Sequence, residues 1–545
     1  MHSRTTSAAT AATGTTYGFL DYYTNATDEE DIEETENQVA NTQQMEHTHM
    51  ASAYITKHET KESIVESRRD FASLKERINS GMSIKESPLP FRKSAMKQSI
   101  KNSTTDRYGF QKTNQYISTK DYNDWWNEYC PYLIRRKAKW IKFLERNGLY
   151  YEPNLVPSRF PARSEEMARF VRKGIPAEWR GKAWFSFVGG VEKMKDNKGL
   201  YEALVNESTD LVNENTEAIE KDLHRTFPDN VYFKEQNSSM LDTLRRVLKC
   251  FSMFKPSIGY SQSLNFIAGL LLLFMNEEET FWMLVIVTEK FLPGVHESNL
   301  EGLSVNQGML MLCLKQYLPD VWKIIMDNDD LGDIPDDDTS YLFFLPTLTF
   351  CTTSWFMSLF IGVLPIETTL RIWDIIFYHN SKTIFQVSLG IFKMLDPELR
   401  KFYCRAHGIS TLFTHSDTDL TLKSTRLQEN NRDVLGSDLF QLIQNTPKRV
   451  INTNLFIDTY VQNTFTQEEI RRCREFVVQS RQRHANLIDR RKELGMTHEE
   501  RKELLKQERG VISGVWEERR MRTGLWNVGL NRRIKKIYSK GPPPK

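Results

Sequence analysis

The chain has 545 residues, enough for one large domain or for two to four domains of ordinary size. Its 73 basic and 71 acidic residues leave a net charge of +2, so no field over the whole molecule points to nucleic acid as a partner. The six cysteines are scattered, without a CxxC pair or zinc-ligand spacing. The start of the chain lacks the apolar core of a secretory signal. We therefore expect a cytoplasmic protein with reduced thiols and no metal site of its own.

The first 117 residues are rich in Thr, Ser, Asn and Ala, and then in Ser and Lys. Such a composition buries too little apolar surface to offset its ordering entropy, so we expect disorder at 1–117. Order is expected from about Lys120, where apolar residues at helical spacing run to a natural helix stop at Asn147–Gly148. From Glu165 to Phe402, repeated apolar helical stretches predict an all-α domain of more than 200 residues.

An uncharged stretch at 340–366 is long enough to cross a bilayer. A proline at Pro346 and polar residues over Cys351–Ser354 interrupt it, which is typical of two buried helices joined by a polar turn. The acidic residues Asp336–Asp338 precede it, where a membrane anchor usually carries basic residues. We therefore expect buried helices here, with a membrane-integral protein as the alternative.

Two capping boxes, Thr466 with Glu469 and Thr497 with Glu500, predict two charged helices near the C-terminus. A solvated helical hairpin or coiled-coil arm is favoured over a dedicated binding surface. The last segment, Arg519–Lys545, carries nine basic residues and no acidic one, which suits an anionic membrane surface, an acidic protein or a solvated tail. The expected segments are a disordered region at 1–117, a leading helical segment at 118–171, the main helical domain at 172–402, an irregular and helical extension at 403–462, the charged arm at 463–510 and the basic tail at 511–545.

A self-contained catalytic site is not visible, because the chain has no phosphate-binding GxxxxGK[ST] loop, no HExxH, no GxSxG and no kinase motif set. One polar segment stands out against its apolar surroundings. Its residues Ile219, Asp222 and Arg225 are three apart and so drift slowly across one helix face. Pro228 disfavours helical geometry at Phe227, which predicts that Arg225 lies in or beside the last turn. Taken alone, Asp222 and Arg225 are typical of a surface ion pair.

A second polar segment precedes a strongly apolar helix. Pro256 and Gly259 predict a break before this helix, and Ser261 or Ser263 can cap it. Gln262 is therefore expected in the loop or in the first turn. Free N–H groups and the helix dipole attract phosphate oxygens at such a point. Taken alone, Gln262 is typical of an ordinary loop glutamine.

Together the two segments resemble the signature motifs of the TBC-domain family, the GTPase-activating proteins of Rab GTPases. The motifs are IxxDxxR at Ile219–Arg225 and YxQ at Tyr260–Gln262, followed by Asn265. Upstream, Gly174–Trp184 is similar to the opening RxxxW element of the family, and downstream Ser354–Phe377 is similar to its late core segment. The scaffold residues of these two elements are Arg180, Trp184, Arg371, Trp373 and Asp374.

The resemblance implies an all-α, V-shaped, two-lobed domain that acts on a GTP-bound Rab. It implies that Arg225 neutralises charge developing on the phosphate and that Gln262 orients the attacking water. Asp222 is implied to hold Arg225, and Tyr260 and Asn265 to shape the Gln262 loop. No cofactor of its own is implied, because GTP and magnesium are carried by the partner.

The segment Pro293–Leu310 departs from the commoner family pattern of paired tyrosines. It resembles the fungal branch that acts on exocytic Rabs during polarised growth. This resemblance implies a role in vesicle transport and peripheral recruitment to membranes at sites of polarised growth, with the basic tail as a possible contact. The alternative function is a non-catalytic Rab-binding scaffold, since some family members lack working fingers.

Overall fold

The structure is a computed structural model that describes residues 104–149, 156–234, 238–327, 339–346, 348–406, 432–461 and 464–493. Within these ranges every regular element is a helix, and β-structure is limited to two isolated bridges. The all-α fold expected from the sequence is therefore confirmed. The basic tail at 511–545 and the chain before residue 104 lie outside the described residues.

The first half of the described chain contains α5 (Thr119–Arg146), α6 (Glu165–Arg172), η2 (Ala177–Trp179), α7 (Arg180–Phe187), α8 (Gly190–Asp196), α9 (Leu200–Ser208), α10 (Glu214–Leu223), α11 (Ser239–Phe254), α12 (Leu264–Leu272), α13 (Glu277–Ile286) and the π-helical turn η3 (Val287–Phe291). The second half contains α14 (Glu301–Tyr317), α15 (Pro319–Asp327), η4 (Ser340–Leu342), α16 (Thr349–Met357), α17 (Ile366–His379), α18 (Lys382–Ala406), α19 (Arg432–Asn445), η6 (Pro447–Arg449), α20 (Thr453–Thr459) and α21 (Gln467–Glu493).

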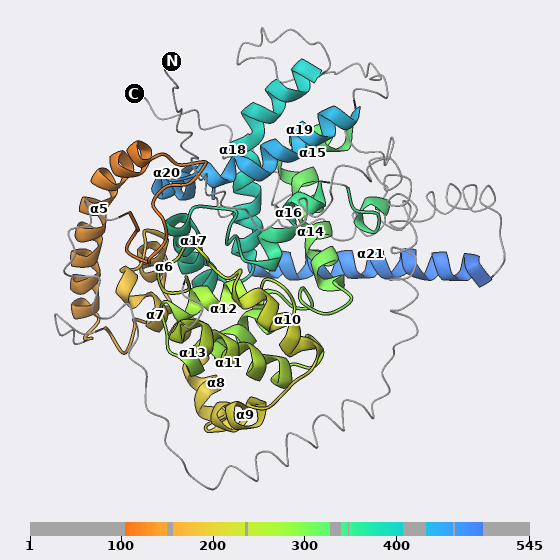
Figure 1. The fold of residues 1–545 in the computed structure, drawn as a ribbon. Coiled ribbons are helices and arrows are strands. Elements are labelled where there is room, and N and C mark those ends of the chain that lie inside the picture. Colours follow the sequence, from red (N-terminus) through yellow and green to blue (C-terminus); the bar gives the residue numbers. More distant parts are fainter. Residues whose placement is uncertain are drawn as a thin grey trace, which may run out of the picture.

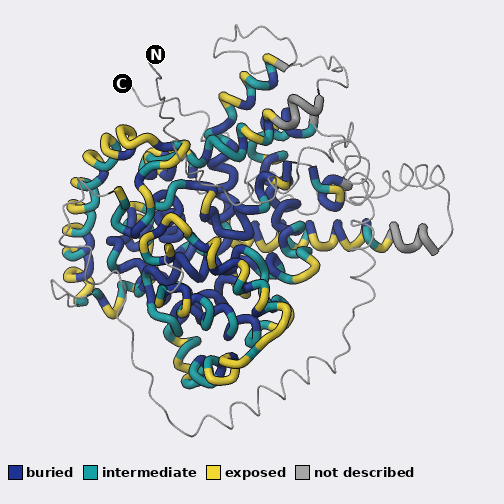
Figure 2. The backbone as a smooth tube through the Cα atoms, in the orientation of Figure 1, coloured by how far each residue is buried: buried dark blue, intermediate teal, exposed yellow. Residues whose placement is uncertain are grey.

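The helices form two packed groups (Figure 1). In the first group α11 is central and contacts α9, α10, α12 and α13. In the second group α14 contacts α15, α16, α18 and α21. Helix α17 packs against α18 of the second group and against α6, α7 and α20. It is connected to the first group through α7, because α7 contacts α8 and α8 contacts α13. Figure 2 shows that burial is continuous where the groups meet, whereas the outer turns of α5 and α9 are exposed.

Helix α5 ends at the stop predicted from Asn147 and Gly148. It ends at Arg146, Asn147 forms its C-cap, and Gly148 takes a φ of +69°. This left-handed conformation is the one that glycine adopts most readily at the end of a helix.

The expectation of disorder throughout 1–117 is wrong for residues 104–117. Tyr108 and Ile117 are buried, and Tyr108 belongs to the main hydrophobic core. A few aromatic residues suffice to order this segment because they enter a core that other parts of the chain have built. The average composition of a hundred residues does not reveal one short segment that packs into the core.

The charged helix α21 begins at the predicted capping box, in which the Glu469 N–H donates to Thr466 Oγ1 at 3.2 Å and the Thr466 N–H donates to Glu469 Oε2 at 2.6 Å. The interpretation as a solvated arm is wrong for its first half. Ile470 and Val477 are buried, and α21 packs against α14 and η4. The apolar stripe is narrow, so the many charges on the remaining faces mask it in the sequence. The second predicted helix, near Thr497, lies outside the described residues.

The uncharged stretch at 340–366 forms η4, α16 and the first residue of α17. The polar residues Cys351–Ser354 do not form the expected turn but lie inside α16, where Thr352 and Thr353 donate their hydroxyls to the Thr349 carbonyl. The turn comes after α16 instead. In the part of the chain that the structure describes, no helix combines the length and the apolarity needed to cross a membrane.

Candidate functional site

Arg225 lies just beyond the C-terminus of α10, as predicted. The helix starts at a reciprocal cap between Asn213 and Thr216 and ends at Leu223. Phe227 has a left-handed φ of +51°, so the right-handed helix cannot continue through it. Non-helical geometry at this residue agrees with the prediction, although a following proline by itself favours an extended conformation. The Arg225 N–H still donates to the Asp222 carbonyl at 3.1 Å, so its backbone closes the last turn.

The Arg225 side chain is 52% exposed and forms a long ion pair with Asp222, at 3.8 Å from Nη1 to Oδ1. Such a pair in contact with water contributes little to stability. The other carboxylate oxygen of Asp222 accepts a hydrogen bond of 2.8 Å from the Tyr260 hydroxyl. Burial raises the pKa of Asp222, and the Tyr260 hydroxyl and the Arg225 guanidinium offset part of that increase. Asp222 is thus held by Tyr260 and orients a guanidinium that remains accessible.

The loop that carries Gln262 begins where α11 ends at Phe254, before Pro256, as predicted. Gly259 has a φ of +59°, and a Cβ atom there would lie 2.6 Å from Asn215 Oδ1. That oxygen accepts a hydrogen bond of 2.9 Å from the Tyr260 N–H. The absence of a side chain at Gly259 therefore lets the loop approach the first turn of α10 closely.

Ser263 follows Gln262 and is the N-cap residue of α12, with a left-handed φ of +92°. The prediction that a serine side chain caps this helix is wrong for Ser263. Its buried hydroxyl donates instead to the Met357 carbonyl at 2.8 Å, and His296 Nε2 lies 2.9 Å from the same oxygen. Burial lowers the pKa of His296 to about 4, so the ring is neutral at pH 7 and Nε2 carries the hydrogen toward Met357.

The first turn of α12 offers fewer amide donors than expected. The Leu264 N–H donates to the Ser261 carbonyl and the Phe266 N–H donates to the Ser263 carbonyl. These amides are engaged by the turn itself, so the site depends on side chains more than on backbone N–H groups.

Two hydrogen-bonded links connect the Arg225 and Gln262 loops, and they form the frame of the site. The first is the bond between Tyr260 and Asp222. The second is made by Asn265 Nδ2, which donates to Thr226 Oγ1 at 2.8 Å and, at the longer distance of 3.5 Å, to the Asp222 carbonyl. In the sequence, Arg225 lies between Asp222 and Thr226, and Gln262 lies between Tyr260 and Asn265. Thr226 was not singled out in the sequence, because nothing in its local spacing indicates a partner 39 residues away.

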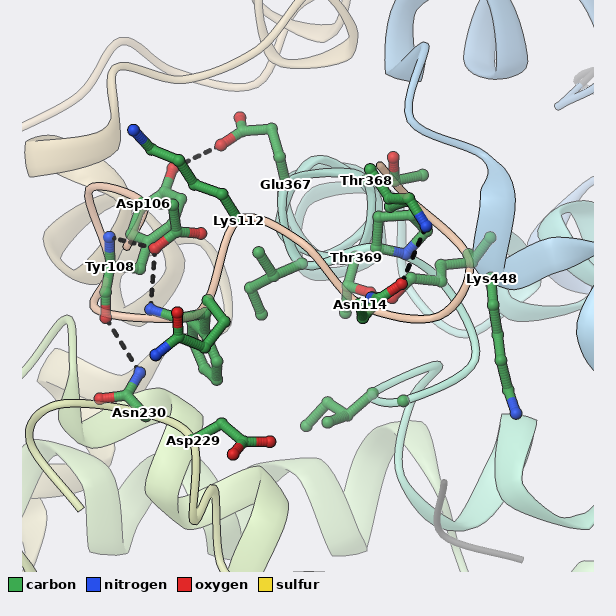
Figure 3. A pocket seen from close by; sticks show the side chains of 18 of the residues that line it. Asp106, Tyr108, Lys112, Asn114, Asp229, Asn230, Glu367, Thr368, Thr369 and Lys448 are labelled. Atoms are coloured by element: carbon green, nitrogen blue, oxygen red, sulfur yellow. Dashed lines mark hydrogen bonds between the residues drawn. The ribbon is translucent and has the colours of Figure 1, made fainter. Parts of the chain in front are cut away.

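Arg225 borders a cavity of about 510 Å³. Figure 3 shows the cavity between the turn that contains Asp229 and Asn230, the segment around Asp106–Asn114, and the first turn of α17 at Glu367–Thr369. Three further elements therefore meet beside the arginine. Among the described residues, no group of acidic, histidine and cysteine side chains is arranged to hold a metal ion.

The residues assigned to the scaffold lie in the buried centre between α7 and α17. Arg180 Nε donates to Asp374 Oδ1 at 3.2 Å, and Trp184 Nε1 donates to the same oxygen at 2.9 Å. Trp373 donates to the Leu359 carbonyl at 2.9 Å.

Arg371, the remaining scaffold residue, donates to the Arg172 carbonyl at 2.8 Å and to Asn454 Oδ1 at 3.0 Å. It therefore ties α17 to the end of α6 and to α20. None of the hydrogen bonds of the five scaffold residues joins them to the Arg225 or Gln262 loop in the part of the chain described.

Glu367 is a buried member of this centre that sequence reasoning missed. Arg180 Nη2 donates to its Oε1 at 3.2 Å, and Arg107 Nη2 donates to its Oε2 at 2.6 Å. Burial alone would raise the pKa of Glu367, but the two guanidinium groups lower it to about 2. A carboxylate in the first turn of a helix is ordinary in a sequence, so only the long-range contacts reveal it.

The described residues form an all-helical fold that carries Arg225 and Gln262 on two hydrogen-bonded loops. A sequence profile of the Rab-GTPase-TBC domain family matches residues 177–400. The chain is 45% identical over 403 residues to the GTPase-activating protein MSB4 of Saccharomyces cerevisiae, covering 69% of this chain and 82% of that one. It is 43% identical over 421 residues to the GTPase-activating protein GYP3 of the same yeast, covering 71% of this chain and 65% of that one, slightly less than two thirds of its length.

The protein therefore belongs to the Rab-GTPase-TBC domain family. Among solved structures, the TBC domain of the Chlamydomonas flagellar RabGAP matches with a TM-score of 0.46 at 20% identity, covering 66% of this chain and 99% of that one.

Proposed function

We propose that this protein stimulates GTP hydrolysis on a Rab-family GTPase by supplying Arg225 and Gln262 in trans. The observation that carries the proposal is the frame of two links, Tyr260 to Asp222 and Asn265 to Thr226, which holds the two loops together. Phosphoryl transfer depends on positioning and electrostatic stabilisation, and an arginine supplied in trans contributes on the order of 10³–10⁵ in rate.

The two side chains have separate tasks in this proposal. Arg225 neutralises charge that develops on the oxygens of the transferred phosphoryl group, and its planar guanidinium can donate to two of them at once. Its ion pair with Asp222 is long at 3.8 Å, so the guanidinium can exchange that partner for phosphate oxygens at low cost. Gln262 orients the attacking water. GTP and magnesium arrive with the GTPase, so the protein needs no cofactor.

The test is single-turnover GTP hydrolysis on a panel of purified GTP-loaded Rabs, with the wild type, Arg225→Ala and Gln262→Ala. Arg472→Ala is a matched control, because that arginine is 53% exposed and pairs with Glu468 on α21. We expect both finger variants to lose stimulation of the cognate Rab and the control to retain it. Equal stimulation by the wild type and Arg225→Ala would refute the proposal, and Rab binding without any stimulation would support the non-catalytic scaffold.

We further propose that the partner is an exocytic Rab and that the protein acts in vesicle transport at sites of polarised growth. The support is the resemblance of Pro293–Leu310 to the fungal branch of the family. The histidine of this segment, His296, is buried against Met357, so the proposal requires the choice of Rab to lie in other residues. The same Rab panel tests this, since a stronger effect on Rabs outside exocytosis would contradict it.

Peripheral recruitment to an anionic membrane through Arg519–Lys545 is the last part of the proposal, and it rests on the nine basic residues of that segment. The test compares the full chain with a variant truncated before Arg519, using vesicles with and without phosphatidylserine. We expect truncation to reduce vesicle binding and to leave stimulation in solution unchanged. Equal binding of both proteins would exclude the tail as the membrane contact.

A further inference from the structure

We infer that the segment Thr104–Ile117, here called the strap, positions the Arg225 finger although it lies upstream of the family-matched region 177–400. The inference rests on the proposed function, since it assigns a role in the same reaction.

The strap contains a tight turn held by its own hydrogen bonds. Asp106 Oδ1 accepts the N–H of Tyr108 at 2.8 Å and the N–H of Phe110 at 2.9 Å. Gly109 has a φ of +89°, and a Cβ atom at that position would lie 2.8 Å from Val231 Cγ2. The turn therefore requires glycine and fits closely against the chain that follows Arg225.

This turn makes three contacts with the residues that follow the finger. The Gly109 carbonyl accepts the Val231 N–H at 3.0 Å. The Tyr108 carbonyl accepts Asn230 Nδ2 at 3.1 Å (Figure 3). The ring of Phe110 meets the ring of Phe227 edge-on, with 5.2 Å between centroids and an angle of 88°.

The other side of the strap is fixed to the buried centre of the protein. The Tyr108 hydroxyl donates to Glu367 Oε2 at 2.7 Å and accepts a hydrogen bond from Arg180 Nη1 at 2.6 Å. Arg107 donates to Glu367 Oε2 at 2.6 Å. The strap thus connects the first turn of α17 and the start of α7 to the turn that follows Arg225. The strap, the first turn of α17 and the turn after Arg225 line the cavity of about 510 Å³.

Arg225 needs such support because the helix that precedes it has ended. Two residues later, Phe227 takes a left-handed φ of +51°, a conformation that costs a bulky residue on the order of 1 kcal/mol or more and persists only where its surroundings enforce it. Three rings surround Phe227, namely Phe110, Phe233 and Phe266. Of these, Phe110 alone comes from outside the region 177–400. Loss of its ring is expected to let the turn relax and to displace the guanidinium.

The experiment measures initial rates of GTP hydrolysis against the concentration of a cognate GTP-loaded Rab, with the full chain. We expect Phe110→Ala to lower kcat about 10- to 100-fold with little change in KM, because misplacement of a catalytic group affects the transition state most. Phe110→Leu, which keeps most of the volume, is expected to recover most of the rate. Phe160→Ala is a matched control, since Phe160 is half-buried and meets Phe187 edge-on at 5.7 Å on the side of α7.

Gly109→Ala is a second variant, which displaces the turn without removing any side chain, and thermal unfolding checks that each variant is folded. The decisive measurement is the double variant. If the strap acts through Arg225, Phe110→Ala will have no further effect in an Arg225→Ala background. The inference would be overturned if the losses caused by Phe110→Ala and Arg225→Ala multiplied in the double variant. It would also be overturned if Phe110→Ala and Gly109→Ala raised KM alone or left kcat unchanged. If Arg225→Ala stimulates like the wild type, the proposed function fails instead.

Discussion

The arginine–aspartate pair at the end of α10 and the pair between α7 and α17 use the same side chains in different surroundings. Arg225 and Asp222 are 3.8 Å apart, and the arginine is 52% exposed. Arg180 and Asp374 are 3.2 Å apart, and their exposed fractions are 1% and 0%. Burial makes every partner of Arg180 necessary, because an unpaired buried charge is costly. Exposure leaves Arg225 able to exchange one anionic partner for another, which a finger requires.

Glu367 beside Arg180 and Asp222 beside Arg225 differ in the number of guanidinium groups that they face. Burial is the largest influence on the pKa of both Glu367 and Asp222, and it raises each. At Glu367 two guanidinium groups reverse that effect and bring the pKa to about 2. At Asp222 the guanidinium of Arg225 and the hydroxyl of Tyr260 offset only part of it. At Asp374, the other carboxylate beside Arg180, burial outweighs the guanidinium groups of Arg180 and Arg371 and still raises the pKa.

The largest expected effect is the loss of catalysis in Arg225→Ala. We expect stimulation of the cognate Rab to fall by on the order of 10³ or more, equivalent to about 4 kcal/mol of transition-state stabilisation. The free energy of unfolding should change by less than about 1 kcal/mol, because the exposed pair contributes little to stability. Single-turnover hydrolysis and urea unfolding measure the two quantities. A large loss of stability would show that this pair is structural after all.

The converse is expected for Arg180→Ala. Removing this guanidinium leaves Asp374 and Glu367 buried without a full set of partners, which should cost about 3–5 kcal/mol of unfolding free energy. Urea or thermal unfolding checks this, with Arg472→Ala as the control. If Arg180→Ala unfolds at the same urea concentration as the wild type, the charged residues between α7 and α17 do not stabilise the fold in this way.

Lysine substitutions sharpen the same contrast. Arg180→Lys should lose about 2 kcal/mol of stability, because one ammonium group cannot reach Asp374, Glu367 and Tyr108 together. Arg225→Lys should unfold like the wild type and still fail to stimulate hydrolysis, since it lacks the planar fork. Urea unfolding and single-turnover GTP hydrolysis should be measured for both Arg180→Lys and Arg225→Lys. Retained stimulation by Arg225→Lys would mean that a positive charge alone is sufficient.

The smallest expected effect is that of Asp222→Asn. Stimulation should fall about 10-fold, because the neutral amide holds Arg225 less firmly. Burial raises the pKa of Asp222 above its ordinary value of 3.8, so the ionised form is disfavoured in the folded state. At pH 7 the asparagine variant should therefore be as stable as the wild type or more stable, by less than about 1 kcal/mol. That difference should disappear as the pH falls below 4, where the aspartate is protonated in both states. A variant clearly less stable at pH 7 would contradict this assignment.

Local signals in the sequence were sufficient for the C-terminal ends of the two helices that precede the site residues. Pro228, Pro256 and Gly259 act on their own backbone or on that of a neighbour, and the structure ends α10 and α11 where they indicate. The roles of Arg225 and Gln262 followed from a family resemblance, and they stay predictions until hydrolysis is measured. The capping role expected of Ser263 was wrong, because a buried hydroxyl found a carbonyl acceptor from α16, 94 residues away in the chain.

The sequence by itself therefore determined the all-α class, the C-terminal ends of α10 and α11, and the two segments that carry the candidate fingers. Tertiary structure alone decided that the strap is ordered, that Tyr108 reaches Glu367 across 259 residues, and that Asn265 holds Thr226. The physical reason is the range of the interactions. Backbone conformation responds to neighbouring residues, whereas the partner of a buried polar group depends on which distant elements pack together. The contacts around Arg225 are such long-range contacts, so only the folded chain shows them.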